Sequence, residues 1–187
     1  MIGKSYELVP LDPESDSDVV KRWFEKDSIT KYMFYGQRPQ TRVSIQEWLT
    51  NDINGNNDVF TIYNGKSREN RIGLAGLYSI SQTARSAELR ILIGEEKFWN
   101  KGVGTEVVSV LLFYAFDRLN LNSVWLGVTD ENESAIHMYK KCGFVENGKR
   151  RAALYRNGKY YDAIWLDILE SEYREKFYDK HREEFGV

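Results

Sequence analysis

The stretch EEKFWNKGVGTEVV, residues 95–108, places two glycines, Gly102 and Gly104, directly before a run of helix-forming residues. A dinucleotide-binding fingerprint is disfavoured because Val107 stands where its third glycine belongs, and no Gly-Lys-Ser/Thr tripeptide completes a Walker A loop. Two interpretations remain open. The glycines could simply let the chain turn into a helix, or the unpaired N–H groups and dipole at the helix start could hold a pyrophosphate.

The segments around the glycines alternate between helix and strand patterns. Strands are predicted at 59–63, 71–80 and 87–93, as an antiparallel meander, because short apolar runs there are separated by polar turns. A buried helical face of about four turns follows the glycines. Its residues are Val107, Val108, Leu111, Leu112, Ala115 and Leu119. The continuous apolar run at 123–129 is typical of a strand covered on both faces.

The two ends of the chain complete the predicted fold. Residues 6–11 predict a strand, and a helix capped by Ser15 or Ser17 is expected to run to about Asp27. A second short helix is expected at 44–53.

The remaining elements lie in the second half of the chain. A helix is predicted from about Asn132 to Cys142. Two strands, 144–155 and 160–169, are joined by Asn157-Gly158, a hairpin signal, and a short charged helix ends the chain. The order of elements predicts an α/β domain built round one sheet.

The composition excludes several classes of protein. The 187 residues are 42% hydrophobic and carry a formal net charge of −2, which predicts one domain over 1–187 and gives no reason to expect nucleic acid as a partner. No apolar run reaches the roughly 18–20 residues that span a bilayer, and the N-terminus does not resemble a signal peptide. With one cysteine and two histidines, no metal site and a cytoplasmic location are expected.

A second stretch, NESAIHMYKKCGF at residues 132–144, raises the same question as the glycine pair. Each notable residue has an ordinary structural explanation. Asn132 is a good helix cap, Tyr139 could be a core aromatic residue, and Gly143 could end the helix.

Together the two stretches resemble the GNAT superfamily of acyl-CoA-dependent N-acetyltransferases, over about residues 6–170. The family motif Gln/Arg-x-x-Gly-x-Gly/Ala is met at 99–104, except that Trp99 replaces its first residue. The motif Asn-x-x-(Ala/Ser)-x-x-x-Tyr-x-x-x-Gly-Phe is met at 132–144. Tryptophan followed by NKGVGTE is similar to the branch that contains ribosomal-protein N-terminal, spermidine and nucleotide-sugar acetyltransferases.

The resemblance implies a single mixed, mostly antiparallel sheet flanked by helices, with a splayed central strand pair that holds acetyl-CoA as co-substrate. Residues 91–94 would separate from 123–129 and pair their backbone with the pantetheine arm, and 100–105 would bind the pyrophosphate. The implied cofactor-binding residues are Ile91, Leu92, Ile93, Gly94, Asn100, Lys101, Gly102, Val103, Gly104, Thr105 and Asn132.

Acetyl transfer from a thioester to an amine requires a proton for the leaving thiolate, a base and a polarised carbonyl. The resemblance implies Tyr139 as the general acid, and a phenol suits this task because its reference pKa of about 10 lies above the roughly 8.5 of a thiol. Glu88 is the candidate base, with a surface glutamate as the equal alternative. A backbone N–H near Leu92 or Ile93 would polarise the carbonyl. Cys142 is expected to be a buried small hydrophobic residue rather than a nucleophile.

The amine acceptor is expected to lie against residues 25–54 and 150–162. Arginines and tyrosines there suit a phosphorylated ligand and favour a nucleotide-linked amino sugar. They are Tyr32, Tyr35, Arg38, Arg42, Arg150, Arg151, Tyr155 and Arg156. Glu25, Glu47 and Asp52 would instead suit a polyamine, and a protein N-terminus is a further alternative.

Two other possibilities remain open. The chain could be a non-catalytic acyl-CoA-binding sensor, although such a module would be expected to lose Tyr139 or the glycines. The edge strands and the last hairpin make a homodimer plausible.

Overall fold

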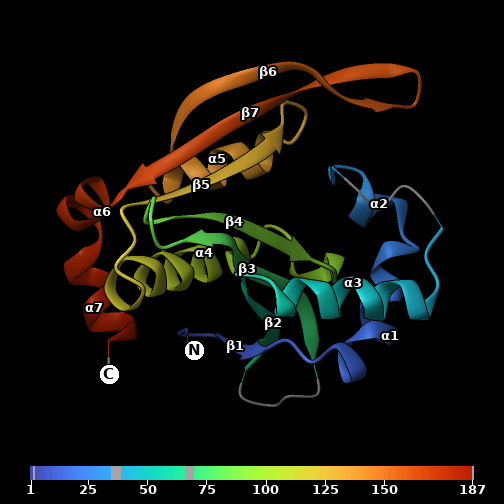
Figure 1. Ribbon diagram of the computed structural model, residues 1–187, viewed down its shortest axis with the longest axis horizontal. Coiled ribbons are helices and arrows are strands. Elements are labelled where there is room, and N and C mark those ends of the chain that lie inside the picture. The colour runs from blue at the N-terminus through green and yellow to red at the C-terminus, as the bar shows by residue number, and fades with distance from the viewer. Residues whose placement is uncertain (2, 35–38, 66–69, 187) are drawn as a thin grey trace.

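The computed structural model describes residues 1, 3–34, 39–65 and 70–186, and its strands form one seven-stranded sheet in the order β1-β2-β3-β4-β5-β7-β6 (Figure 1). The β4–β5 pair is parallel and every other neighbouring pair is antiparallel. The strands are β1 (Tyr6–Pro10), β2 (Asp58–Asn64), β3 (Arg71–Ser81), β4 (Ser86–Ile93), β5 (Ser123–Thr129), β6 (Val145–Arg156) and β7 (Lys159–Leu169). The predicted mixed, mostly antiparallel sheet is therefore confirmed.

Helices cover both faces of this sheet. They are α1 (Pro13–Phe24), α2 (Asp27–Thr30), α3 (Arg42–Asn54), the 3₁₀ turn η1 (Glu96–Phe98), α4 (Val103–Phe113), the π-helical η2 (Tyr114–Arg118), α5 (Glu133–Lys141), α6 (Glu170–Lys176) and α7 (Tyr178–Phe185). The charged tail thus forms two helices rather than one.

Alternating side chains of the central strands feed two separate cores. On one face, Leu77 and Leu89 pack with Leu111 of α4. On the other face, Leu74 packs in a cluster with Trp23 of α1 and with residues of α3. Because each fully buried large apolar side chain contributes about 1.5–3 kcal/mol, these two cores fix the helices on the sheet.

The first helix differs from the prediction at both ends. Asp12, not Ser15 or Ser17, is the N-cap: its side chain accepts a hydrogen bond from the Glu14 backbone N–H at 3.1 Å. Pro13 follows at the first helical position, where a missing N–H has no consequence. The helix ends at Phe24, three residues before the expected end.

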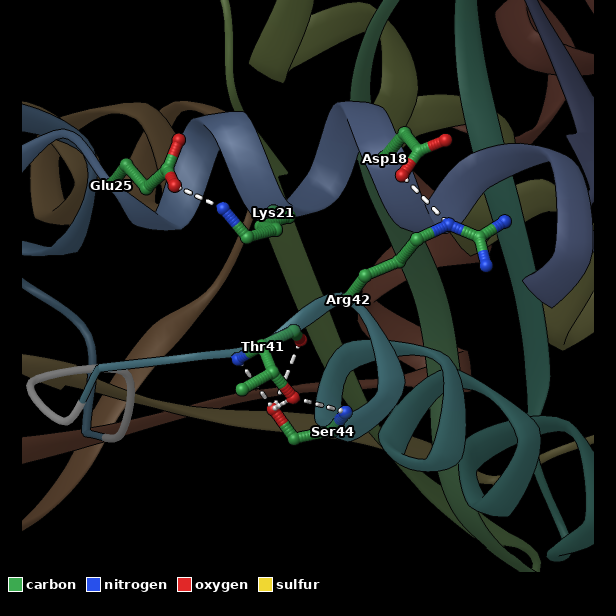
Figure 2. Close-up of polar contacts among 6 residues, drawn as sticks. All are labelled: Asp18, Lys21, Glu25, Thr41, Arg42 and Ser44. Atoms are coloured by element: carbon green, nitrogen blue, oxygen red, sulfur yellow. Dashed lines mark hydrogen bonds and ion pairs between the residues drawn. The ribbon is translucent and has the colours of Figure 1, made fainter.

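The helix α3 begins at Arg42, earlier than predicted, because Thr41 and Ser44 form a capping box (Figure 2). Figure 2 also shows Arg42 donating to Asp18 of α1, at 2.8 Å from Nε to Oδ1, and Lys21 paired with Glu25 within α1. Since exposed ion pairs of this kind are worth about 0–1 kcal/mol, packing rather than charge holds α1 against α3.

The apolar sequence of β5 predicts a strand covered on both faces, whereas the structure buries one face throughout and the other fully only at Thr129. Val124, Leu126 and Val128 are buried against α4 and its neighbours, whereas Trp125 and Gly127 on the other face are only half-buried. The reason is tertiary: the core formed with α1 and α3 takes residues from β2, β3 and β4 but includes none from β5.

The final hairpin agrees with its sequence signal. Asn157 and Gly158 both have positive φ, 50° and 80°, as a type I′ turn requires. The turn therefore sets the register of the pairs next to it, from Arg156–Lys159 to Leu154–Tyr161, whereas irregularities farther along β6 shift the register of the remaining pairs.

Candidate active site

The two central strands separate part-way along their length. β4 and β5 pair only through Ser86–Ser123, Ala87–Val124 and Glu88–Trp125. Beyond Glu88 no pairing between them is present in the described residues, and Figure 1 shows the two strands diverging toward their C-terminal ends. The predicted splay of this strand pair is thus present.

The backbone of β4 points unpaired groups into this splay. The Gly94 N–H donates to the Ile72 carbonyl of β3 at 2.9 Å, and because backbone groups alternate sides along a strand, Ile91 and Ile93 point theirs toward β5. Leu92 instead faces its β3 partner, Leu74. Of the two backbone N–H groups predicted to polarise a carbonyl, that of Ile93 is therefore the one that faces the splay.

Trp99, the residue that departs from the family motif, has a structural role that sequence reasoning did not assign. Its indole Nε1 donates to the Ile93 carbonyl at 2.9 Å, which ties the loop after β4 to the end of that strand. A second tryptophan, Trp23, lies so close to Gly94 that an added Cβ would approach its ring to 2.1 Å. Gly94 therefore has a packing role, whether or not it contacts a cofactor.

The start of α4 has the properties of an anion site. Gly102 is its N-cap with φ of +82°, and no side chain caps the helix. Val103, Gly104 and Thr105 begin the helix, so their N–H groups have no intrahelical acceptor. A Cβ added to Gly102 would meet no described atom within 4 Å, which leaves space beside these donors. The loop from β4 brings this helix start to the splayed end of the strand.

Tyr139 of α5 is 7% exposed, and its ring packs edge-on against Phe144 at 5.6 Å between centroids. No described residue hydrogen-bonds with its hydroxyl group. Burial raises the pKa of Tyr139 above its usual 10, so the phenol keeps its proton at neutral pH. Asn132 caps α5 by accepting from the Ala135 backbone N–H at 3.2 Å, so the ordinary explanation of Asn132 is also present.

Glu88 lies in the last pair before the strands separate, and its side chain is 16% exposed. Its Oε2 accepts a hydrogen bond from Arg90 Nη2 at 2.6 Å, and the Arg90 guanidinium lies 4.4 Å from the centre of the Tyr78 ring. Sequence reasoning did not identify Arg90, because an arginine two residues along a strand gives no signal of its own. The role of Glu88 as a base stays a prediction.

Cys142 is a buried thiol, 4% exposed, and burial raises its pKa to about 12. In the folded protein at pH 8 we expect iodoacetamide to alkylate Cys142 at least about 100-fold more slowly than in the unfolded chain, because the thiolate is scarce and shielded. Alkylation followed by mass spectrometry, with and without denaturant, measures this ratio. Similar rates in the two states would contradict the burial of the thiol.

The residues predicted for the acceptor are only partly brought together. Tyr32, which follows α2, lies beside Arg156 of β6, at 6.0 Å between the guanidinium carbon and the ring centre. Arg42 instead pairs with Asp18, and Arg150, Arg151 and Tyr155 are exposed on β6. Tyr35 and Arg38 lie outside the described residues.

Within residues 1, 3–34, 39–65 and 70–186, two kinds of feature are absent. No group of three or more His, Cys, Asp or Glu side chains is placed to hold a metal ion. No helix in the same ranges is long and apolar enough to cross a membrane.

A family model described as an acetyltransferase (GNAT) domain matches residues 6–145. The chain belongs to the GNAT acetyltransferase family. The family and the class of enzyme inferred from the two motifs are thereby confirmed, and with them acetyl-CoA as the co-substrate that GNAT acetyltransferases use. The backbone of Ile91 and the Ile93 N–H, which face the splay, and the open space beside Gly102 fit such a ligand.

Several relatives of this GNAT chain have names that specify an acceptor. A spermidine N(1)-acetyltransferase of Vibrio cholerae is 39% identical over 107 residues, which is 57% of this chain and 61% of that protein. A putative ribosomal N-acetyltransferase of Bacillus subtilis is 28% identical over 89% of this chain and 90% of its own length. Among solved structures, a spermidine N-acetyltransferase from Vibrio cholerae in complex with CoA and spermine superimposes with a TM-score of 0.81 at 30% identity, covering 91% of this chain and 98% of that one.

Proposed function

We propose that this chain transfers an acetyl group from acetyl-CoA to a primary amine by direct attack in a ternary complex. The observation that carries the proposal is the splay of β4 and β5, which is followed in the chain by the uncapped start of α4. The buried Tyr139 belongs to the apolar cluster against which Ile91 and Ile93 of β4 pack. The backbone of Ile91 and Ile93 would hold the pantetheine arm, 100–105 would hold the pyrophosphate and Asn132 would add a contact.

For each chemical requirement of acetyl transfer, this arrangement offers one residue. Acetyl-CoA supplies a thioester whose carbonyl carbon can be attacked by a neutral amine. The Ile93 N–H would stabilise negative charge on the carbonyl oxygen, and Tyr139 would give its proton to the leaving thiolate. Glu88 would accept the proton of the amine through water, competing with its ion pair to Arg90.

The first candidate acceptor is a polyamine, in place of the amino sugar. The spermidine acetyltransferases among the relatives favour it, and the sheet face opposite α4 supplies carboxylates beside the splay. Glu88 pairs across the strands with Tyr78, and burial together with the nearby charge of Asp52 of α3 raises the pKa of Tyr78. Asp52 Oδ2 is buried, and no described residue hydrogen-bonds with it. Burial raises the pKa of this carboxyl group.

A protein N-terminus is the second candidate acceptor. It is favoured by the relative from Bacillus subtilis, which matches nearly the whole of both chains and is described as a putative ribosomal N-acetyltransferase. A non-catalytic sensor is disfavoured because Tyr139 and both glycines are retained at the splay. A homodimer stays a proposal, and one structural neighbour from Vibrio cholerae is described as dodecameric.

The experiment is thiol release from acetyl-CoA with a panel of amines: spermidine, spermine, short peptides, amino sugars and their nucleotides. We expect turnover with polyamines or with peptides. Acetyl-CoA binding without turnover on any amine would contradict the transferase and favour the sensor. Absence of binding would contradict the assignment of the splay and of the helix start.

A further inference from the structure

The acceptor side of the sheet can be located from the cofactor side. Because α4 packs on one face of the splay and its start would hold the pyrophosphate, the amine must approach from the opposite face. Along β5 and β7, every second side chain points toward α4, and the side chains between them lie on the opposite face. We call it the acceptor face; its residues are Trp125, Gly127 and Thr129 of β5 and Tyr161, Ala163, Trp165 and Asp167 of β7.

At the end of the acceptor face lies an arginine that the proposed chemistry does not use. Arg156 is only 8% exposed, and its Nη2 donates to Glu131 Oε2 at 2.5 Å. Its guanidinium lies 5.0 Å from the centre of the Tyr161 ring and 6.0 Å from that of Tyr32. Three separate segments, the loop after β5, the last hairpin and the end of α2, thus converge on one side chain.

This convergence leaves one strong donor unused. Arg156 Nη1 is buried, and among the residues that the structure describes it has no hydrogen-bond partner. Thr129, also on the acceptor face, is fully buried, and no described residue hydrogen-bonds with its Oγ1. An unsatisfied buried polar group is unfavourable, and more so when it is charged, so a ligand that satisfies it binds more tightly.

The chemistry around the unused donor points to oxygen rather than to a second ammonium group. Glu131 already accepts a hydrogen bond from Arg156, so its negative charge is engaged there. A guanidinium N–H can only donate, and Lys31 adds a second positive charge beside Tyr32, at 4.8 Å from its ring centre. An ammonium ion would meet these cations, whereas a carbonyl, carboxylate or phosphate oxygen would accept from Arg156.

We propose that Arg156 determines acceptor specificity by donating a hydrogen bond from Nη1 to an oxygen atom of the amine substrate. The inference rests on the proposed transferase function and narrows it. Spermidine has no oxygen and would leave Arg156 unsatisfied. A peptide N-terminus brings a carbonyl oxygen a few atoms from its amine, and an amino sugar brings hydroxyl or phosphate oxygens.

The test compares Arg156→Met with Arg182→Met, which removes an exposed arginine of α7. Steady-state kinetics are measured with a tripeptide amide, an amino sugar, its nucleotide and spermidine. We expect Arg156→Met to lower kcat/KM for the preferred oxygen-bearing acceptor about 10- to 100-fold, mainly through KM, because a charge-assisted hydrogen bond is lost. Turnover of spermidine should change less than about threefold, and Arg182→Met should change neither.

Which of the three oxygen-bearing acceptors shows the loss identifies the source of the oxygen. The inference would be overturned if Arg156→Met lowered kcat/KM equally for spermidine and for these acceptors, or if it lowered neither. It would also be overturned if the wild-type protein acetylated polyamines alone. The transferase proposal would survive each of these three results. No turnover on any amine would remove both proposals. Thermal unfolding and acetyl-CoA binding of each variant are measured to separate misfolding from altered recognition, and Glu131→Gln, which keeps an oxygen acceptor for Arg156, should retain the preference.

Discussion

Replacing Tyr139 by phenylalanine is expected to lower kcat by about 10²- to 10⁴-fold, the range typical of a lost general acid, with acetyl-CoA affinity nearly unchanged. The ring is buried against Phe144, so the substitution would keep the packing and remove only the hydroxyl group, which no described residue binds. Stopped-flow or steady-state thiol release gives kcat, and calorimetry gives the affinity for acetyl-CoA.

The pH dependence provides a second check on the same residue. Because burial raises the pKa of Tyr139 above its usual 10, the acid form persists as the pH rises, and wild-type kcat should not fall between about pH 8 and 10 from loss of this proton. Unchanged kcat in Tyr139→Phe would reject the acid role. A loss of kcat accompanied by an equal loss of acetyl-CoA binding would show a structural role instead.

Replacing Gly102 by alanine is expected to weaken acetyl-CoA binding about 10- to 100-fold, because the new Cβ would occupy the open space beside the N–H groups of α4. The backbone φ of +82° adds a conformational cost of about 1–2 kcal/mol for any residue with a side chain. Isothermal titration calorimetry measures the binding, and chemical denaturation measures the stability.

Gly158 provides a matched control for this substitution. It has φ of +80° at the hairpin turn, and an added Cβ there would also meet no described atom within 4 Å. Gly158→Ala should therefore lose similar stability while retaining acetyl-CoA affinity. Equal affinity in the two variants would show that the space beside Gly102 does not receive the pyrophosphate.

Much of the fold could be predicted from local patterns. The strand at 123–129 and the strands of the meander were found within about two residues, and the Asn157-Gly158 turn was predicted from its chemistry. The start of α1 was misplaced because several residues near it can cap a helix, and only the folded chain selects Asp12. The second face of β5 was misjudged because hydrophobicity does not show where a covering helix ends.

The candidate site likewise contains residues that the sequence predicts and residues that only the folded structure brings together. Glycines, Asn132 and Tyr139 lie in motifs whose spacing is local, so the sequence alone determined the family, whereas the positions that would hold acetyl-CoA stay a prediction from it. Arg90 and Arg156 stand in no motif. Their partners, Glu88 and Glu131, were brought to them by strand alternation and by the meeting of a loop with a hairpin.

What the sequence by itself determined is therefore the order of elements, the family and the two motifs, because each depends on residues close together in the chain. The tertiary structure decided the point at which β4 and β5 separate, the side from which an amine can approach and the burial of Arg156 with an unused donor. These depend on packing between segments far apart in sequence, where burial and the pairing of charges are set only once the sheet and its helices have assembled.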